Sequence, residues 1–152
     1  MNEAVTVALW QLARPPHAMR EVWCQELSSL AELSRLRARL RRTLTGSDTV
    51  LHPERERWSE RLVLIADELT SNALRHAAPP VATALSRTAD VWMVAVSDRS
   101  TGIPPEPAQD RDPCLGGFGL YLIADLSMQH GWFGDRGAKT VWAAVQADPA
   151  PA

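Results

Sequence analysis

Hydrophobic positions early in the chain recur at helical spacing in two stretches. Residues 28–44, SSLAELSRLRARLRRTL, carry five leucines at this spacing, with a serine at 28 or 29 as the expected cap and Gly46 as the stop. Residues 53–77 open with a proline and acidic residues. Their apolar face is formed by Trp58, Leu62, Ile65, Leu69 and Ala73. This pattern predicts two long amphipathic helices.

Strand-like runs lie on both sides of these helices. Residues 19–27, MREVWCQEL, predict a first strand, and residues 80–87 and 91–98 predict a hairpin of buried strands that turns at 88–90. A third helix is expected at roughly 120–129, stopping at His130 and Gly131. Residues 132–146, WFGDRGAKTVWAAVQ, predict two short strands around a GDRG turn.

The chain length favours one domain. With 152 residues, of which 45% are hydrophobic and 22% charged, the composition is that of a soluble globular protein. We expect a domain at 18–147, an N-terminal extension at 1–17 whose role the sequence does not disclose, and a disordered tail at 148–152. Residues 99–117 are rich in proline and glycine and predict a long loop, a kind of segment that is often functional.

The net charge and the cysteines limit which binding partners and which cellular location are expected. A net charge of -2 gives no general attraction to nucleic acid or to an anionic membrane. The N-terminus indicates neither a signal peptide nor a transmembrane helix. Cys24 and Cys114 lack the spacing of a zinc site or a disulfide scaffold, so a reduced, cytoplasmic location is expected. Fifteen arginines against one lysine, with abundant alanine and proline, are typical of a GC-rich bacterial genome.

A polar stripe marks the second long helix. Glu68, Asn72 and His76 recur every four residues, so their side chains fall within an arc of ~80° beside the apolar face. The amide oxygen of Asn72 suits a hard cation such as Mg²⁺, and a carboxylate at a dry margin can act as a general base. On its own, the stripe favours a simpler interpretation, in which these are ordinary polar residues beside the apolar face of a helix. A single histidine such as His76 is more often packed or hydrogen-bonded than a metal ligand.

Two further motifs contain residues that could bind a purine base or phosphate groups. Asp98 ends a buried strand, where its carboxylate needs hydrogen-bond donors; a purine amino group is a suitable donor, and Gly102 would let a flat ring approach. In LGGFGL, residues 115–120, glycines run into a helix start, which is a favourable site for phosphate oxygens. The alternatives are a turn-forming aspartate and a glycine turn without a ligand. Neither the P-loop nor the dinucleotide fingerprint is present.

The order of these motifs resembles the GHKL ATPase superfamily, which includes histidine kinases, gyrase-type topoisomerases and anti-sigma factor kinases. ELTSNALRHA resembles its N box, SDRSTGI its first glycine box, GGFGL its second and GAKTVWAAV its closing strand. Ser100 stands where the first box usually has its first glycine. The chain is most similar to small ATP-binding proteins related to anti-sigma factor serine/threonine kinases. Without a phosphoacceptor helical hairpin, it does not resemble a complete sensor histidine kinase.

The resemblance implies an α+β fold of the Bergerat type, a two-layer sandwich with helices on one face of a mixed, mostly antiparallel sheet. ATP would lie between the helices and a lid formed by residues 103–116. Glu68 would be the base or water-orienting residue, Asn72 the Mg²⁺ ligand and Asp98 the acceptor for the adenine amino group. The remaining nucleotide-binding residues implied are Gly102 at the adenine pocket, Gly117, Gly119 and Leu120 of the phosphate motif, and Thr140 near adenine.

Three functions remain open at this point. The first is an ATP-dependent serine/threonine kinase that phosphorylates an antagonist (anti-anti-sigma) protein and sequesters a sigma factor. The second is a nucleotide-binding regulator that holds a partner without kinase activity. The third is nucleic-acid binding by the five arginines of residues 34–42, although a solvated face or an acidic protein partner is favoured there. Related proteins often form homodimers, and the sequence leaves the oligomeric state open.

Overall fold

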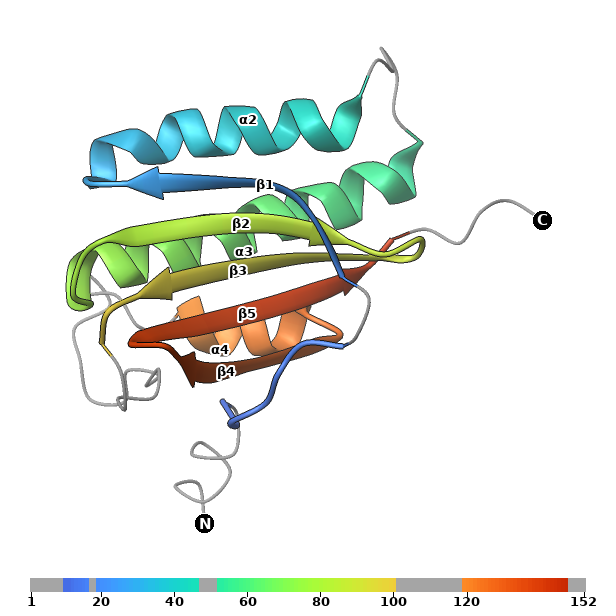
Figure 1. Ribbon diagram of the computed structural model, residues 1–152. Coiled ribbons are helices and arrows are strands. Elements are labelled where there is room, and N and C mark those ends of the chain that lie inside the picture. Colours follow the sequence, from blue (N-terminus) through green and yellow to red (C-terminus); the bar gives the residue numbers. More distant parts are fainter. Residues whose placement is uncertain (1–9, 17–18, 47–51, 101–118, 148–152) are drawn as a thin grey trace.

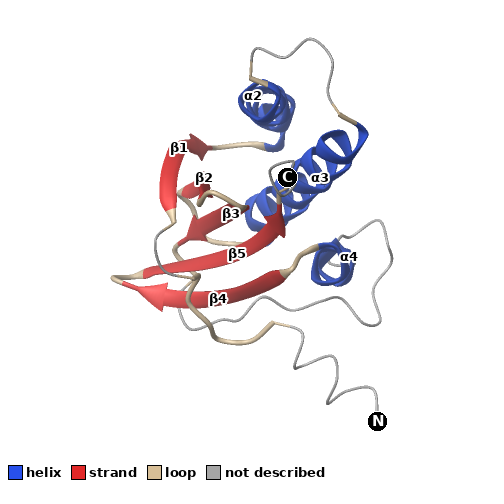
Figure 2. Cartoon of the chain, turned by 90° about the vertical axis from the view of Figure 1, so that its right-hand side faces the viewer, coloured by secondary structure: helices blue, strands red, loops and turns tan. Residues whose placement is uncertain are grey.

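Five strands form one sheet in the order β1-β2-β3-β5-β4 in the computed structural model, which describes residues 10–16, 19–46, 52–100 and 119–147. The strands are β1 (Arg20–Leu27), β2 (Val81–Arg87), β3 (Val91–Asp98), β4 (Gln129–Asp135) and β5 (Ala138–Gln146). Neighbouring strands in this order pair antiparallel. The helices α2 (Leu33–Thr45), α3 (Pro53–His76) and α4 (Gly119–Leu126) lie on one side of the sheet, as Figure 2 shows. The predicted two-layer α+β architecture is confirmed.

Helix α2 begins after a short 3-10 turn, η1 (Leu30–Glu32). The carboxylate of Glu32 accepts hydrogen bonds from the backbone N–H groups of Ser28 and Ser29, which satisfies donors that the first turn leaves free. Leu36 is fully buried, whereas Leu30 is 43% exposed because it lies in the turn before the helix. At the other end Gly46 adopts a φ of +63°, a conformation that glycine adopts without a steric penalty.

Helix α3 is the central helix, and its apolar row is buried as predicted. Trp58, Leu62, Ile65, Leu69 and Ala73 all belong to the main core cluster, together with inward-facing residues of β2, β3 and β5. Pro53 occupies its first turn, where the missing N–H costs nothing. Although α3 has 24 residues, no described helix is both long and apolar enough to cross a membrane.

The arginines of α2 mostly contact the protein itself. Arg37 pairs with Asp67 and Arg41 with Glu60, so both tie α2 to α3. The guanidinium of Arg39 lies 4.3 Å from the ring centroid of Trp23 on β1. Three of the five arginines in this stretch are therefore used to attach α2, which leaves less charge for a nucleic-acid partner.

Two short turns connect the strands of the two hairpins where the sequence predicted them. Between β2 and β3, the N–H of Thr88 donates to the carbonyl of Val91 at 2.9 Å. Between β4 and β5, Arg136 and Gly137 form the turn with φ values of +50° and +80°. Two consecutive positive φ angles match the twist of an antiparallel hairpin with a two-residue turn. The predicted GDRG turn is confirmed.

The boundary of the third helix was predicted wrongly. Helix α4 ends at Leu126, and Gln129 already belongs to β4, where it pairs with Ala144. The N–H of Met128 donates to the carbonyl of Ala144 at 2.8 Å, so the chain has left the helix by this residue. Residues 127–130 fit either element locally, and pairing with β5 decides in favour of the strand.

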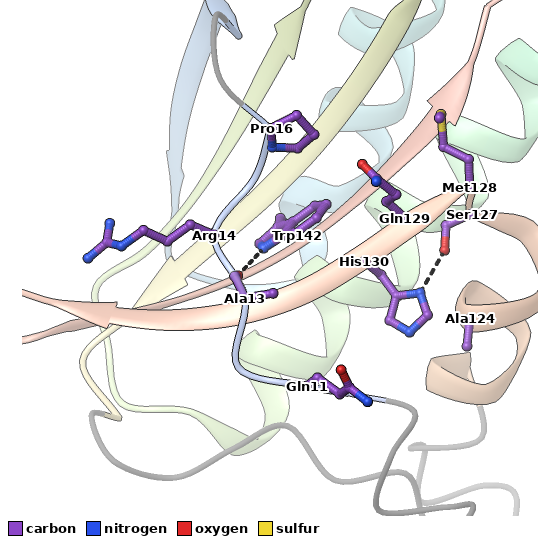
Figure 3. A pocket seen from close by; sticks show the side chains of 10 residues that line it. All are labelled: Gln11, Ala13, Arg14, Pro16, Ala124, Ser127, Met128, Gln129, His130 and Trp142. Carbon is purple, nitrogen blue, oxygen red and sulfur yellow. Dashed lines mark hydrogen bonds between the residues drawn. The ribbon is translucent and has the colours of Figure 1, made fainter.

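The N-terminal segment 10–16 lies along the outer edge of β4. Trp132 donates its backbone N–H to the carbonyl of Gln11 at 3.1 Å, and Ala13 donates to the carbonyl of Trp132 at 2.9 Å. The indole Nε1 of Trp142 donates to the carbonyl of Ala13 at 2.8 Å (Figure 3). Trp10 is only 4% exposed and belongs to the main core cluster. This part of the expected extension is therefore integrated into the fold.

Candidate functional site

Three elements meet at one edge of the molecule, which Figure 1 shows at the ends of β3 and α3 and the start of β5. The N–H of Ala78, in the link after α3, donates to the hydroxyl of Ser100 at 2.8 Å. The N–H of Arg99 donates to the carbonyl of Ala78 at 3.0 Å. In the sheet, Asp98 of β3 lies opposite Lys139 of β5. Two hydrogen bonds thus hold the link after α3 against the residues that follow β3.

Asp98 is the buried acid of this edge. Side chains alternate along a strand, and Val94 and Val96 belong to the core under the helices, so Asp98 lies on the helix-covered face. The residue is 3% exposed. One carboxylate oxygen, Oδ1, accepts the N–H of Ser100 at 2.6 Å, and the other, Oδ2, lies 3.8 Å from the Nζ of Lys139.

Lys139 is a residue beside Asp98 that the sequence patterns did not single out. It is 7% exposed and lies on the same face as Asp98, because Val141, two residues further along β5, belongs to the same core. Lysine is almost never fully buried unless it is paired. The signal that could have found it is that it is the single lysine of the chain and comes two residues after the β4–β5 turn.

The polar stripe of α3 ends near this edge, and its members lie in different environments. Glu68 and Asn72 are half-buried, while His76, the last residue of the helix, is exposed. Burial raises the pKa of the Glu68 carboxyl above its ordinary value, and the neighbouring charge of Asp67 adds to this, while Arg75 opposes it. A carboxylate that holds its proton more tightly is a stronger base, as the general-base prediction requires.

Thr140 is not brought to the face of Asp98. Its hydroxyl lies 2.9 Å from that of Ser97, and these two residues are cross-strand neighbours. Trp142, two residues further along β5, packs in the cluster on the other face of the sheet. Thr140 therefore lies on the open face, and the structure places Lys139 where β5 approaches Asp98.

The predicted phosphate motif is only partly described. Gly102, Gly117 and the expected lid at 103–116 lie outside the described residues. Gly119 is the first residue of α4, so the predicted helix start after the glycines is observed. Leu120 is 2% exposed and belongs to the main core cluster, so its side chain fixes α4 to the core.

Comparison with known protein families identifies this arrangement. A family model described as the histidine kinase-like ATPase domain matches residues 27–144. The chain belongs to this family. A search of curated proteins found no match. The match includes Glu68, Asn72, Asp98 and Lys139, and it leaves out the N-terminal segment 10–16 that pairs with β4.

Two of the hollows on the described surface of this histidine kinase-like ATPase domain lie beside the segments discussed above, and neither is lined by Glu68 or Asn72. One, of about 330 Å³, lies at the same edge and is lined by Asp98, Ser97, Arg99 and neighbouring residues. The second, of about 590 Å³, lies between the N-terminal segment and the end of α4 (Figure 3). There the ring nitrogen Nδ1 of His130 lies 3.1 Å from the hydroxyl of Ser127.

The residues present fit a Mg²⁺–nucleotide better than a metal ion alone. Among the described residues, no group of three or more His, Cys, Asp or Glu side chains is placed to hold a metal. The amide of Asn72 and the carboxylate of Glu68 lie one helical turn apart, and both are half-buried. Mg²⁺ is commonly bound by one or two protein oxygens together with phosphates and water, which fits this small donor set.

Proposed function

We propose that this protein binds ATP with Mg²⁺ at the α3–β3 edge and acts as a serine/threonine protein kinase. Its substrate would be an antagonist protein, and it would also sequester a sigma factor. The observation that carries the nucleotide site is Asp98, a carboxylate that is 3% exposed at the end of a strand in a histidine kinase-like ATPase domain. A buried carboxylate at a strand end is costly unless donors satisfy it, and an adenine amino group is such a donor.

In this proposal each residue has one task. Asp98 accepts a hydrogen bond from the adenine amino group, and Asn72 provides its amide oxygen to Mg²⁺. Glu68 takes the proton from the hydroxyl of the acceptor serine or threonine as that oxygen bonds to the terminal phosphorus, and the bond from this phosphorus to the bridging oxygen breaks, so that ADP leaves. The raised pKa of Glu68 supports this task, because a base is most effective when its pKa lies close to the working pH. The bound Mg²⁺ would neutralise charge on the phosphates during transfer.

Nucleotide binding is tested by calorimetric titration with ATP and Mg²⁺. We expect Asp98→Asn to weaken binding about tenfold or more, because a hydrogen bond to a buried charge is lost. We expect Asn72→Ala to remove the dependence on Mg²⁺. The matched control is Asp135→Asn, an exposed aspartate that lines the 330 Å³ hollow, and it should leave the affinity unchanged. No binding by the unaltered protein would refute the proposal.

Kinase activity is tested by transfer of labelled phosphate from ATP to candidate antagonist proteins. Loss of a positioned general base should lower the rate about 10²- to 10⁴-fold in Glu68→Gln, while ATP binding stays within about threefold. ATP binding without transfer to any partner would favour the alternative, a partner-holding regulator without kinase activity. Ser100, which stands where the first glycine box usually has its first glycine, is compatible with that alternative.

A further inference from the structure

The single lysine of the chain is buried beside the proposed nucleotide site. Fifteen of the sixteen basic residues are arginines, and the remaining one, Lys139, is 7% exposed. A buried ammonium is costly unless it is paired or has a binding task, since lysine is strongly hydrated in water. Its neighbour is Asp98, which the proposed function assigns to the adenine amino group.

The pair is looser than a direct hydrogen bond. The Nζ of Lys139 and the Oδ2 of Asp98 are 3.8 Å apart. A charge-assisted N–H···O bond is about 2.7–2.9 Å long. An ammonium has three N–H donors and a carboxylate has about four acceptor positions, so this pair saturates neither group. Within the described part of the chain, Ser100 is the other residue whose contact with the Asp98 carboxylate is observed.

A loose buried pair presents an acceptor and a donor side by side on the helix-covered face. A purine ring that carries a donor next to an acceptor on its edge is complementary to this Asp98–Lys139 pair. In adenine the amino group at C6 is the donor, and the ring nitrogen N1 is the adjacent acceptor. This edge lies farthest from the ribose, so it is the edge that can enter a buried site while the phosphates stay at the surface.

We propose that Lys139 is a second base-reading residue, which donates a hydrogen bond to N1 of adenine while Asp98 accepts one from the amino group. This inference rests on the proposed function and deepens it. With the ligand bound, the loose contact between Asp98 and Lys139 is replaced by two charge-assisted hydrogen bonds to the base. Lys139 thereby selects a base with an acceptor at N1, which a carboxylate alone cannot do.

The test combines a change in the ligand with a change in the protein. Titration calorimetry compares ATP with 1-deaza-ATP, in which N1 is replaced by C–H, for the unaltered protein and for Lys139→Met. We expect the unaltered protein to bind 1-deaza-ATP about 10- to 100-fold more weakly than ATP, and Lys139→Met to bind the two about equally. Lys139→Arg, which keeps charged donors, should restore part of the discrimination. 7-Deaza-ATP is the control, and its affinity should stay within about threefold of that for ATP.

The possible outcomes distinguish a failure of the proposed ATP-binding function from a failure of the role assigned to Lys139. If the unaltered protein does not bind ATP, the proposed function and this inference both fail. If ATP binds and Asp98→Asn weakens it, but 1-deaza-ATP is disfavoured equally with and without Lys139, only the inference fails. A greater loss for 7-deaza-ATP than for 1-deaza-ATP would also overturn it.

A second measurement needs no substitution, in case Lys139→Met does not fold. Because the chain has one lysine, protein with ¹³C,¹⁵N-lysine gives NMR signals from a single lysine side chain. ATP should shift the Cε and Nζ signals of Lys139 strongly, and 1-deaza-ATP should shift them much less. Equal shifts with both nucleotides would contradict a hydrogen bond from Lys139 to N1.

Discussion

Single acidic residues in this protein differ mainly because of their surroundings. Asp98 is buried beside a backbone donor and an ammonium, while Glu68 is half-buried on α3 next to Asp67. For Glu68, removal from water disfavours the charged form, and a neighbouring negative charge acts in the same direction. The proposed roles follow this difference, since a paired carboxylate suits recognition and a more basic one suits proton transfer.

The raised pKa of Glu68 predicts a specific dependence of stability on pH. The folded state favours the protonated acid, so the stabilisation is fully present below the ordinary pKa of 4.5 and is lost as the pH rises through the higher folded value. Glu68→Gln should therefore be more stable than the unaltered protein at pH 7, and the difference should shrink toward pH 4. Thermal unfolding followed by circular dichroism across this range measures it.

The control for this prediction is Glu26→Gln, which alters an exposed glutamate on β1. We expect its melting temperature to follow that of the unaltered protein at every pH. A gain in Glu68→Gln that does not change with pH would show that the carboxylate charge is not the cause.

At the scale of elements, α2 is attached through one row of leucines. Leu36 is 0% exposed and packs in a cluster with Leu27 of β1 and Leu33. Leu36→Ala should reduce the free energy of unfolding by about 2–5 kcal/mol, since it removes buried methyl groups and leaves a cavity. The matched control is Leu30→Ala in the preceding turn, where a change within about 0.5 kcal/mol is expected. Urea unfolding measures both, and equal losses would contradict the assigned packing.

The β4–β5 hairpin contains one unfavourable residue. Arg136 adopts a φ of +50°, where a side chain with a Cβ costs about 1–2 kcal/mol and where asparagine is tolerated better. Arg136→Asn should therefore stabilise the protein by about 0.5–1 kcal/mol, because Asn-Gly is a preferred sequence for this turn. The opposite change is Gly137→Ala, which introduces a Cβ at a φ of +80° and should cost about 1 kcal/mol. Urea midpoints that move in the same direction for both variants would refute this account.

At the scale of the whole molecule, the N-terminal segment joins residues that are distant in the sequence. Trp10 packs against the imidazole of His130, with 4.7 Å between ring centroids, and Ala13 accepts the indole N–H of Trp142. The segment covers the edge strand β4 and contributes to the core shared by α4 and the sheet. A covered edge is also protected from pairing with other chains.

Removal of the Trp10 side chain should loosen this attachment. Trp10→Ala should lower the free energy of unfolding by about 3 kcal/mol, the low end for a buried tryptophan, because the segment can separate before the whole fold opens. The N–H of Trp132, which donates to Gln11, should lose its protection from hydrogen exchange. Leu12→Ala is the control, since Leu12 is 69% exposed. Unchanged protection in Trp10→Ala would show that the tryptophan does not hold the segment.

Much of the fold could be predicted because local periodicity coincides with the final packing. The leucine row of α2, the apolar row of α3 and the β2–β3 hairpin are observed where the pattern predicted them. The end of α4 and the start of β4 were not predicted, because residues 127–131 fit a helix or a strand until β5 lies beside them. For the candidate site, Glu68, Asn72 and Asp98 were singled out by their spacing and position together with the family resemblance, whereas Lys139 was missed because only the β3–β5 register places it opposite Asp98.

The sequence by itself determined α2, α3, the β2–β3 hairpin, the β4–β5 turn and the family-defining motifs, since each depends on residues that are close together along the chain. Only the tertiary structure decided which distant residues meet. It placed the N-terminal segment on β4, because the outer edge of this strand has backbone N–H and C=O groups that no other described strand pairs with, and the segment supplies hydrogen-bond partners for them. It also placed Lys139 opposite Asp98 and turned Thr140 away, because the pairing register of β3 and β5 decides which side chains share a face.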